Sequence, residues 1–205
     1  MWVYLMATNG CTPATFSCIC ENAFYFEVAE TDMEEDAFGI SDQHCKHLIR
    51  SKDNKFLLVN AKGQFQGQNL TSQQQCQPDC KFNIQIYKES SLVGRKGRAV
   101  MLYAIKDGKK MVACCNANNE MYPEAMDLPK QIEETAHKAL FYLIKLANET
   151  NKYMFESSLY PQRFLGFEPN ADNPSLNKLV LRHKGKDEVD DRCEMTFSDC
   201  TNFQV

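Results

Sequence analysis

Short apolar segments separated by polar turns fill the chain from about residue 40 to near its C-terminus. Ten segments of this kind recur at intervals of roughly 8–12 residues, and residues 82–87 alternate apolar and polar side chains cleanly. The other segments are 47–50, 56–59, 99–105, 110–115, 140–144, 153–156, 163–167, 179–182 and 194–197. Segments of this length and spacing indicate strands, so the sequence predicts an all-β barrel or sandwich.

The connections between these segments carry signals of their own. Asp107-Gly108 lies between two segments and predicts a tight hairpin turn. Only residues 129–136, with Pro129 at a suitable first helical position, and a weaker stretch around Gln73 have the character of helices. The polar, Gln-rich stretch 60–80 is predicted to be a long surface loop.

Charge divides the chain at residue 36. The first 36 residues contain seven acidic residues and no Lys or Arg, so the net charge of −4 for the whole chain becomes +3 for the remainder. An acidic arm can mask a basic body electrostatically, although solvated acidic tails are also common. Residues 22–28 read as a strand inside this arm. We therefore predict an acidic pro-segment, residues 1–36, and a folded domain, residues 37–205.

A protease signal lies at this border. The hydrophobic-Glu-X-Asp stretch that ends at Asp36 is followed by the small residue Ala37, a pattern that a caspase-type protease accepts. The N-terminus lacks the basic start of a secretory signal, and no run of 18 apolar residues occurs, so we expect synthesis in the cytosol and no membrane association. The prediction is a latent protein that one cut between Asp36 and Ala37 activates.

Residues with catalytic potential are scattered along the chain. The four histidines are dispersed, and no Ser or Cys stands in a recognisable nucleophile context. Cys114 or Cys115 could form a dyad with a distant His, but buried structural thiols are the simpler interpretation. No glycine-rich loop ends in the Lys-Ser or Lys-Thr of a phosphate site. We predict that the chain is not an enzyme.

Metal and nucleic-acid sites are also poorly supported. Residues 44–47 and the pair Cys76 and Cys80 hold soft ligands, but a second clear Cys pair is missing, so no metal and no cofactor are predicted. Arg95, Lys96 and Arg98 occupy a glycine-flanked loop, which is either a solvated tip or a protein-binding tip. The modest positive charge of the body and the lack of interleaved aromatic residues argue against nucleic acid.

Residues 152–165 resemble a segment of a known protein family. Phe155, Glu156 and Ser157, followed by 163–165, resemble the Phe-Glu-Ser signature of interleukin-1-type cytokines. Further segments of the chain resemble the processing site, the first hairpin, the central strands and the closing strands of that family. They are 35–39, 49–60, 87–90, 97–100, 179–181 and 191–197. The resemblance runs in order from about residue 22 to 198.

The resemblance implies a β-trefoil with twelve strands, pseudo-threefold repetition and a six-stranded barrel closed by hairpins. It also implies a pro-inflammatory cytokine precursor that caspase-1 cuts after Asp36 and that leaves the cytoplasm without a signal peptide. The implied partners are a receptor with two immunoglobulin-like chains and a soluble binding protein. We expect a monomer that induces interferon-γ.

Receptor-binding residues of the family carry over unevenly. Arg50 matches a position that binds the primary receptor chain, and Asn54 stands where an Asp is expected. Lys96 stands where the family has Arg, which keeps the charge but loses the bidentate fork, and Arg98 stands where the family has Met. On the surface implied to bind the accessory receptor chain, Glu124 and Lys138 both oppose the expected charges.

Two other classes of protein stay open at this point. One is a different member of the interleukin-1 family. The other is an unrelated trefoil, either an intracellular binding module or a carbohydrate-binding lectin. Trefoil lectins of the ricin type repeat a Gln-x-Trp motif, whereas the one Trp of this chain is Trp2, in the arm, which argues against a lectin.

Overall fold

The computed structural model describes residues 14–20, 23–28, 38–89, 97–132, 136–146, 150–185 and 188–199. The chain divides into two compact units, Met1–Met33 and Glu34–Val205. None of the helices among the described residues has the length and apolar character needed to cross a membrane.

The first unit contains an antiparallel hairpin of β1 (Ala14–Cys20) and β2 (Ala23–Val28). Strand β2 confirms the strand predicted inside the arm, whereas β1 was not foreseen. The register pairs Phe16 with Phe26 and Ile19 with Phe24, with a bulge between Phe16 and Cys18.

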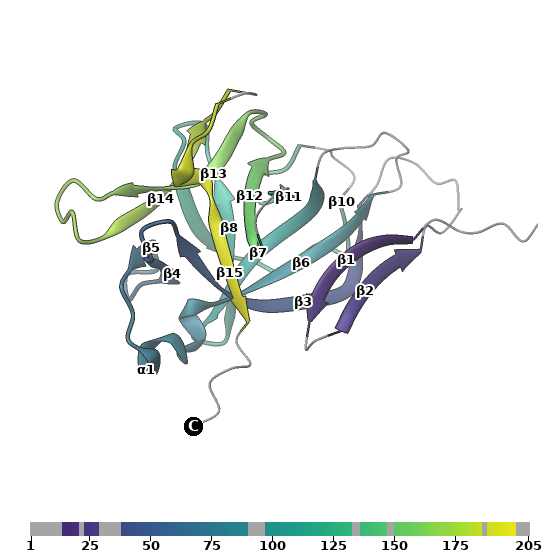
Figure 1. The fold of residues 1–205 in the computed structure, drawn as a ribbon, viewed down its shortest axis with the longest axis horizontal. Coiled ribbons are helices and arrows are strands. Elements are labelled where there is room, and N and C mark those ends of the chain that lie inside the picture. Colours follow the sequence, from purple (N-terminus) through teal and green to yellow (C-terminus); the bar gives the residue numbers. More distant parts are fainter. Residues whose placement is uncertain are drawn as a thin grey trace, which may run out of the picture. The chain divides into compact units, whose positions relative to one another are not determined.

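The second unit is all-β, as predicted, and its 13 strands form one sheet (Figure 1). The strands are β3 (Phe38–Ser51), β4 (Phe56–Val59), β5 (Phe65–Gln68), β6 (Lys81–Glu89), β7 (Arg98–Lys106), β8 (Lys109–Cys115), β9 (Met121–Ala125), β10 (Gln131–Ile132), β11 (Phe141–Lys145), β12 (Lys152–Ser157), β13 (Arg163–Pro169), β14 (Asn177–His183) and β15 (Met195–Asp199). One α-helical turn, α1 (Ser72–Gln75), and two 3-10 turns, η1 (Pro78–Cys80) and η2 (Asp191–Cys193), complete the described elements.

One pairing scheme occurs three times along the second unit. The three groups of four strands are β3–β6, then β7, β8, β9 and β11, and finally β12–β15. In each group the first strand pairs with the second and the fourth, and the second pairs with the third. The fourth strand of each group pairs with the first strand of the next, through β6–β7, β11–β12 and β15–β3. Six strands therefore close into a barrel, which is the β-trefoil architecture, and the two-residue strand β10 is additional to the expected twelve.

Each group contributes one fully buried Phe to the barrel core. Phe82, Phe141 and Phe155 are fully buried and belong to a single core cluster with Ile49, Leu102 and other apolar residues. Burying side chains of this size supplies most of the stabilisation in such a core, about 1.5–3 kcal/mol for each. The threefold repetition of the pairing is thus matched by a threefold distribution of its largest core residues.

A second apolar cluster covers the outer face of β7. Val100 and Leu102 face the barrel, whereas Met101 and Tyr103 belong to an outer cluster with Ile132 and other residues. Strand β7 is therefore buried on both faces, which explains why its sequence reads as a continuous apolar run. The segment that follows β9 provides the cover, and the Tyr87 hydroxyl donates a hydrogen bond of 2.9 Å to the carbonyl of Pro129 there.

This cover corrects the helix expected at residues 129–136. The described part of that range forms β10, whose residues pair with Phe38 and Gly39, and the Ile40 amide donates to the Lys130 carbonyl at 2.8 Å. Backbone groups that bond to a neighbouring strand cannot form a helix, and Ile132 is buried in the outer cluster. Tertiary packing therefore overrides the local signal of Pro129.

The long loop expected at residues 60–80 is also wrong, because this stretch contains β5, α1 and η1. Helix α1 confirms the weaker helical signal around Gln73, and Thr71 caps it: its hydroxyl accepts from the Gln74 amide. All ten predicted strand segments lie within or overlap observed strands. The Asp107-Gly108 turn is confirmed too, with φ of +50° and +73°, the positive values that a two-residue hairpin requires.

Candidate functional site

Arg50 lies near the end of β3, where its backbone pairs with Phe56 of β4. Its guanidinium carbon is 6.0 Å from the centre of the Phe56 ring, within range of a cation–π interaction. The Nε atom of Arg50 is buried and has no hydrogen-bond partner among the described residues. A buried donor without an acceptor destabilises a fold by about 1–3 kcal/mol, so packing alone does not explain this Arg.

Asn54 lies in the turn between β3 and β4, exposed, with a φ of +59°. Asn and Asp adopt this left-handed conformation more readily than other non-glycine residues, so the turn accepts either residue. The amide of Asn54 donates to the Ser51 carbonyl at 3.1 Å, which fixes the turn from within. Arg50 and Asn54 therefore belong to one hairpin.

Long-range contacts hold this hairpin from outside. The Lys55 ammonium donates to Oδ1 of the buried Asn177 at 2.9 Å and to the Pro174 carbonyl at 3.3 Å. Lys52 pairs with Asp191. These contacts could not be predicted from the sequence, since the partners are 119 to 139 residues apart and no local pattern connects them.

Arg98 lies far from this hairpin in the fold. Arg98 is the first residue of β7 and is half-buried, and Lys96 lies outside the described residues. At this end of the barrel the paired residues are Gly39 with Lys88 and Tyr87 with Ala99, whereas Leu48 and Lys81 pair at the other end, nearer Arg50. The described members of the predicted receptor set therefore form two groups, with Arg50 and Asn54 at one end of β3 and Arg98 near the other.

Gly97 explains how Arg98 is positioned. A Cβ at this residue would lie 2.9 Å from both the Leu143 carbonyl oxygen and Cγ1 of Ile144. Only glycine lets the chain approach β11 this closely before Arg98 pairs with Leu143.

The Phe-Glu-Ser signature has a structural role for each of its residues. Phe155 fills the barrel core. The Glu156 carboxylate accepts from the Gln162 amide at 2.9 Å, and the Ser157 hydroxyl accepts from the Tyr160 amide at 3.1 Å. Two side chains thus hold the turn between β12 and β13, in which Gln162 has a φ of +63°.

Glu124 of β9 and Lys138 form an ion pair on the rim of the outer cluster. The Lys138 ammonium lies 2.8 and 2.7 Å from the two carboxylate oxygens of Glu124. This hydrogen bond raises the pKa of Lys138. Both side chains are about one-third exposed, so a partner could reach the pair.

The cysteines considered as nucleophiles are inert. Cys114 and Cys115 are buried, as the simpler interpretation predicted, and burial raises the pKa of Cys114 to about 12. Cys76 and Cys80 differ in exposure: Cys76 is exposed, whereas Cys80 is buried. Within the described residues, no three His, Cys, Asp or Glu side chains are arranged to hold a metal ion. The side chains of residues 44–45, and Asp36 and Ala37 with the bond between them, lie outside the described residues.

Comparison with known proteins agrees with this fold. The family model described as Interleukin-1 / 18 matches residues 71–193. The chain is 31% identical to mouse interleukin-18 over 193 residues, which cover 93% of this chain and 94% of that protein. It is 30% identical to human interleukin-18 over 184 residues, covering 85% and 86%. Among solved structures, chicken interleukin-1 beta superposes with a TM-score of 0.57 at 18% identity, covering 78% of this chain and 99% of that one, which supports the trefoil fold.

Proposed function

Because the chain belongs to the interleukin-1/18 family and is a cytokine that resembles interleukin-18, we propose that it is the latent precursor of a pro-inflammatory signal. A caspase-1-type protease cuts it between Asp36 and Ala37 in the cytoplasm. The mature domain leaves the cell without a signal peptide, binds a two-chain immunoglobulin-like receptor and induces interferon-γ. As a member of a cytokine family, the protein is not an enzyme.

The receptor proposal rests on the buried, unsatisfied Nε–H of Arg50. Its Nε is buried without an acceptor, next to an exposed turn that distant residues hold in place. Buried polar groups in native proteins are almost always hydrogen-bonded, and exceptions are enriched where function requires them. We propose that this hairpin, with Arg50 as the anchor and Asn54 beside it, contacts the primary receptor chain.

Arg98, with Lys96 in the loop before it, is proposed to form a second receptor contact. The two groups lie at opposite ends of β3, so one immunoglobulin-like domain need not cover both. The exposed Glu124–Lys138 pair supports a separate contact with the accessory chain. Three separate contacts are compatible with a receptor of two chains with several domains.

The start of the paired structure supports the position of the cut. Strand β3 begins at Phe38, where it pairs with Glu89 and Ile132. The proposed cleavage would therefore separate the acidic arm from the sheet without cutting any paired residue of the barrel. The latency itself is proposed to arise because the arm covers or distorts part of the receptor surface, helped by its charge.

The proposal is tested with the full-length chain and an uncleavable Asp36→Asn control, each incubated with caspase-1. Mass spectrometry identifies the products, and surface plasmon resonance with both receptor chains compares binding before and after digestion. One cut after Asp36, with a gain in receptor binding and in interferon-γ release only for the cleavable chain, supports it. A cut elsewhere removes the activation mechanism, and equal receptor binding by precursor and product contradicts latency.

A further inference from the structure

Ion pairing is distributed unevenly over the second unit. Four cations on and around β12, β14 and η2 are paired with carboxylates: Lys52 with Asp191, Lys152 with Glu194, Lys178 with Glu168, and Arg182 with Glu168 and Asp190. By contrast, none of Lys81, Lys106, Lys109, Lys110 and Lys130 forms an ion pair with a described residue. These five lysines lie on β6, on the β7–β8 hairpin and directly before β10.

The β7–β8 hairpin carries three of these lysines at its tip. Lys106 and Lys109 are directly opposed across the hairpin, and Lys110 is opposed to Ile105. Like charges that face each other across an antiparallel pair are destabilising. The Asp107-Gly108 turn needs neither lysine, because its conformation depends on the two turn residues alone. The hairpin therefore retains an unfavourable pair that folding does not require.

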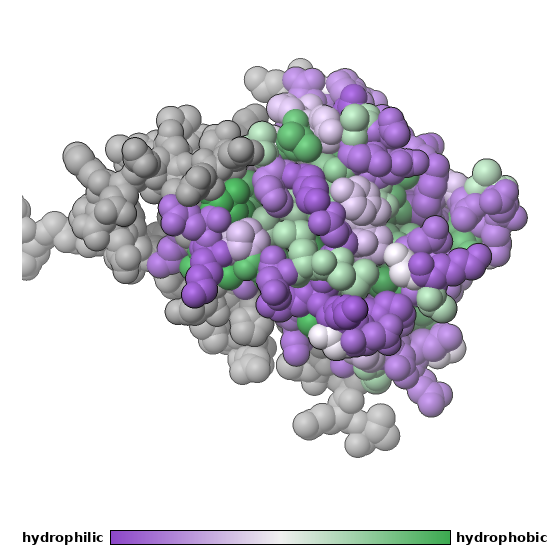
Figure 2. All heavy atoms as spheres, turned by 180° about the vertical axis from the view of Figure 1, so that it is seen from behind, coloured by the Kyte–Doolittle hydropathy of each residue, from purple (hydrophilic) through white to green (hydrophobic). Residues whose placement is uncertain are grey.

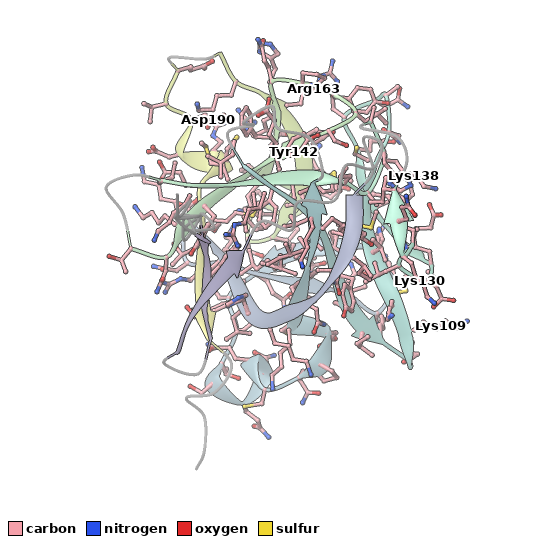
Figure 3. The ribbon with its side chains drawn as sticks, turned by 90° about the vertical axis from the view of Figure 1, so that its right-hand side faces the viewer. Lys109, Lys130, Lys138, Tyr142, Arg163 and Asp190 are labelled. Carbon is pink, nitrogen blue, oxygen red and sulfur yellow. The ribbon has the colours of Figure 1, made fainter. Side chains whose placement is uncertain are left out.

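Further lysines lie close to this hairpin in the fold. Lys81 begins β6 and precedes Phe82, whose backbone partner is Ala104 of β7. Figure 3 shows Lys109, Lys130 and Lys138 along one edge of the molecule, and this edge is the face that Figure 2 views from the front. Hydrophilic side chains prevail there in Figure 2. Residues 106–110 hold three lysines and one anion, Asp107, and Asp127 follows Met126, whose amide donates to the Lys110 carbonyl at 3.2 Å.

We propose that this lysine tip, defined as Lys106, Lys109 and Lys110, binds a sulfated polysaccharide. Lys81 precedes Phe82, the partner of Ala104, and Lys110 pairs with Ile105, so the backbones of Lys81 and Lys110 lie two strand spacings, about 10 Å, apart, comparable to the screening length of physiological salt. Their charges therefore act together on one polyanion, with an affinity that depends steeply on salt. This inference does not rest on the proposed receptor or on the proposed cleavage.

The surroundings favour a flexible, linear polyanion over other partners. A Cβ on Gly108 would meet no atom within 4 Å, so the tip projects into open space and offers no cleft for a small ligand. The centre of the Tyr103 ring lies 5.8 Å from the Lys110 ammonium, and Tyr103 is only 8% exposed, so this ring offers no face on which a base could stack. The large hydrophobic residues exposed on the described surface, Ile40 and Val189, are not on this hairpin, so nothing there inserts into a lipid layer.

The test uses the full-length chain on immobilised heparin. The tip variant carries Lys106→Gln, Lys109→Gln and Lys110→Gln. A matched control carries Lys62→Gln, Lys178→Gln and Lys184→Gln, which removes the same charge elsewhere. We expect the tip variant to lose at least tenfold in affinity at physiological salt, with a shallower dependence of log affinity on log salt, and the control to lose less than threefold. Replacing the three tip lysines by Arg is expected to preserve binding.

Several outcomes would overturn the proposal. Equal losses in the tip and control variants would mean that only net charge matters. Equal affinity of the tip for a single-stranded oligonucleotide or for anionic phosphatidylserine vesicles would assign the surface to a different partner. If the full-length chain does not bind heparin, a variant with Glu34→Gln, Glu35→Gln and Asp36→Asn tests whether the arm masks the tip, and failure of that variant to bind also rejects the proposal.

Discussion

Lys138 and Glu124 form an ion pair with two hydrogen bonds, in which the ammonium lies 2.7 and 2.8 Å from the two carboxylate oxygens. Both residues carry the charge opposite to the one that the family resemblance implies for their positions. In this chain a reversal of one partner would place two like charges in contact, whereas a reversal of both would keep the ion pair.

The first prediction concerns this pair. Glu124→Lys or Lys138→Glu alone should lower the free energy of unfolding by about 1 kcal/mol, because each places like charges together at a partly exposed site. The double variant, Glu124→Lys with Lys138→Glu, should recover most of that loss. Urea unfolding of the four proteins in a double-mutant cycle measures the coupling. A double variant as unstable as the sum of the single variants would show that the contact contributes nothing.

Arg50 gives a prediction that separates stability from binding. Arg50→Met should leave the free energy of unfolding unchanged or raise it slightly, because the variant removes a buried Nε–H without an acceptor and keeps an apolar stem against Phe56. Binding to the primary receptor chain should fall at least tenfold, since the variant loses the charge. Thermal unfolding and surface plasmon resonance of the cleaved protein measure the two effects. Loss of stability parallel to the loss of binding would instead assign Arg50 a structural role.

The Phe-Glu-Ser signature should show a fixed order of effects on stability. Phe155→Ala leaves a cavity in the barrel and should cost about 3–5 kcal/mol. Ser157→Ala removes the acceptor for the Tyr160 amide and should cost about 1–3 kcal/mol, because Ser157 is itself buried. Glu156→Gln keeps an oxygen acceptor for Gln162 and should cost less than 1 kcal/mol. Urea unfolding ranks the three variants, and a large effect of Glu156→Gln would mean that the carboxylate charge is needed.

Much of this fold could be predicted from sequence, since each strand of a trefoil leaves a local pattern. The alternation at 82–87 and the positive-φ turn at Asp107-Gly108 depend only on neighbouring residues, and both were predicted correctly. The failures have one physical cause. Strand β5 and strand β10 exist because of partners distant in sequence, β14 and β3, and their own residues carry weak or contrary local signals. Gln66 and Gln68 of β5 lie in a polar stretch whose composition predicts a loop.

The candidate site also has features that the sequence predicts and features that it does not. Arg50 and Asn54 could be found because a family motif marks them, and their closeness follows from one hairpin. The contacts of Lys55 with Asn177 and of Lys52 with Asp191 could not be found, because they join groups of the trefoil that meet only in the folded chain. The position of the cut and the receptor residues stay predictions.

Asp190 should make the fold sensitive to acid. Burial acts to raise its pKa, but the hydrogen bonds from Arg182 and from the Arg192 amide outweigh burial, so the pKa is lowered in the folded protein. A carboxyl with a lowered folded pKa stabilises the protein above its unfolded pKa, near 3.9, and this contribution disappears as the pH falls through the folded value. Urea unfolding from pH 6 to pH 2 should therefore show a loss below about pH 4. Asp190→Asn should be less stable at pH 6 and should show a smaller loss, and an unchanged slope would exclude Asp190 as a source.

The free thiols should react in a fixed order with iodoacetamide. The thiolate is the reactive form, and burial is the largest cause that raises the pKa of Cys80, Cys114 and Cys193 to about 12 and also raises that of Cys115. Cys76, at the end of α1, is exposed, so among these five it should be alkylated first in the folded protein at pH 8. Mass spectrometry of peptides after timed labelling measures the order, with labelling in urea as the control in which all five react. Early labelling of Cys114 would show that the outer cluster opens readily, since the cover that ends in Lys138 must move away before a reagent can reach that thiol.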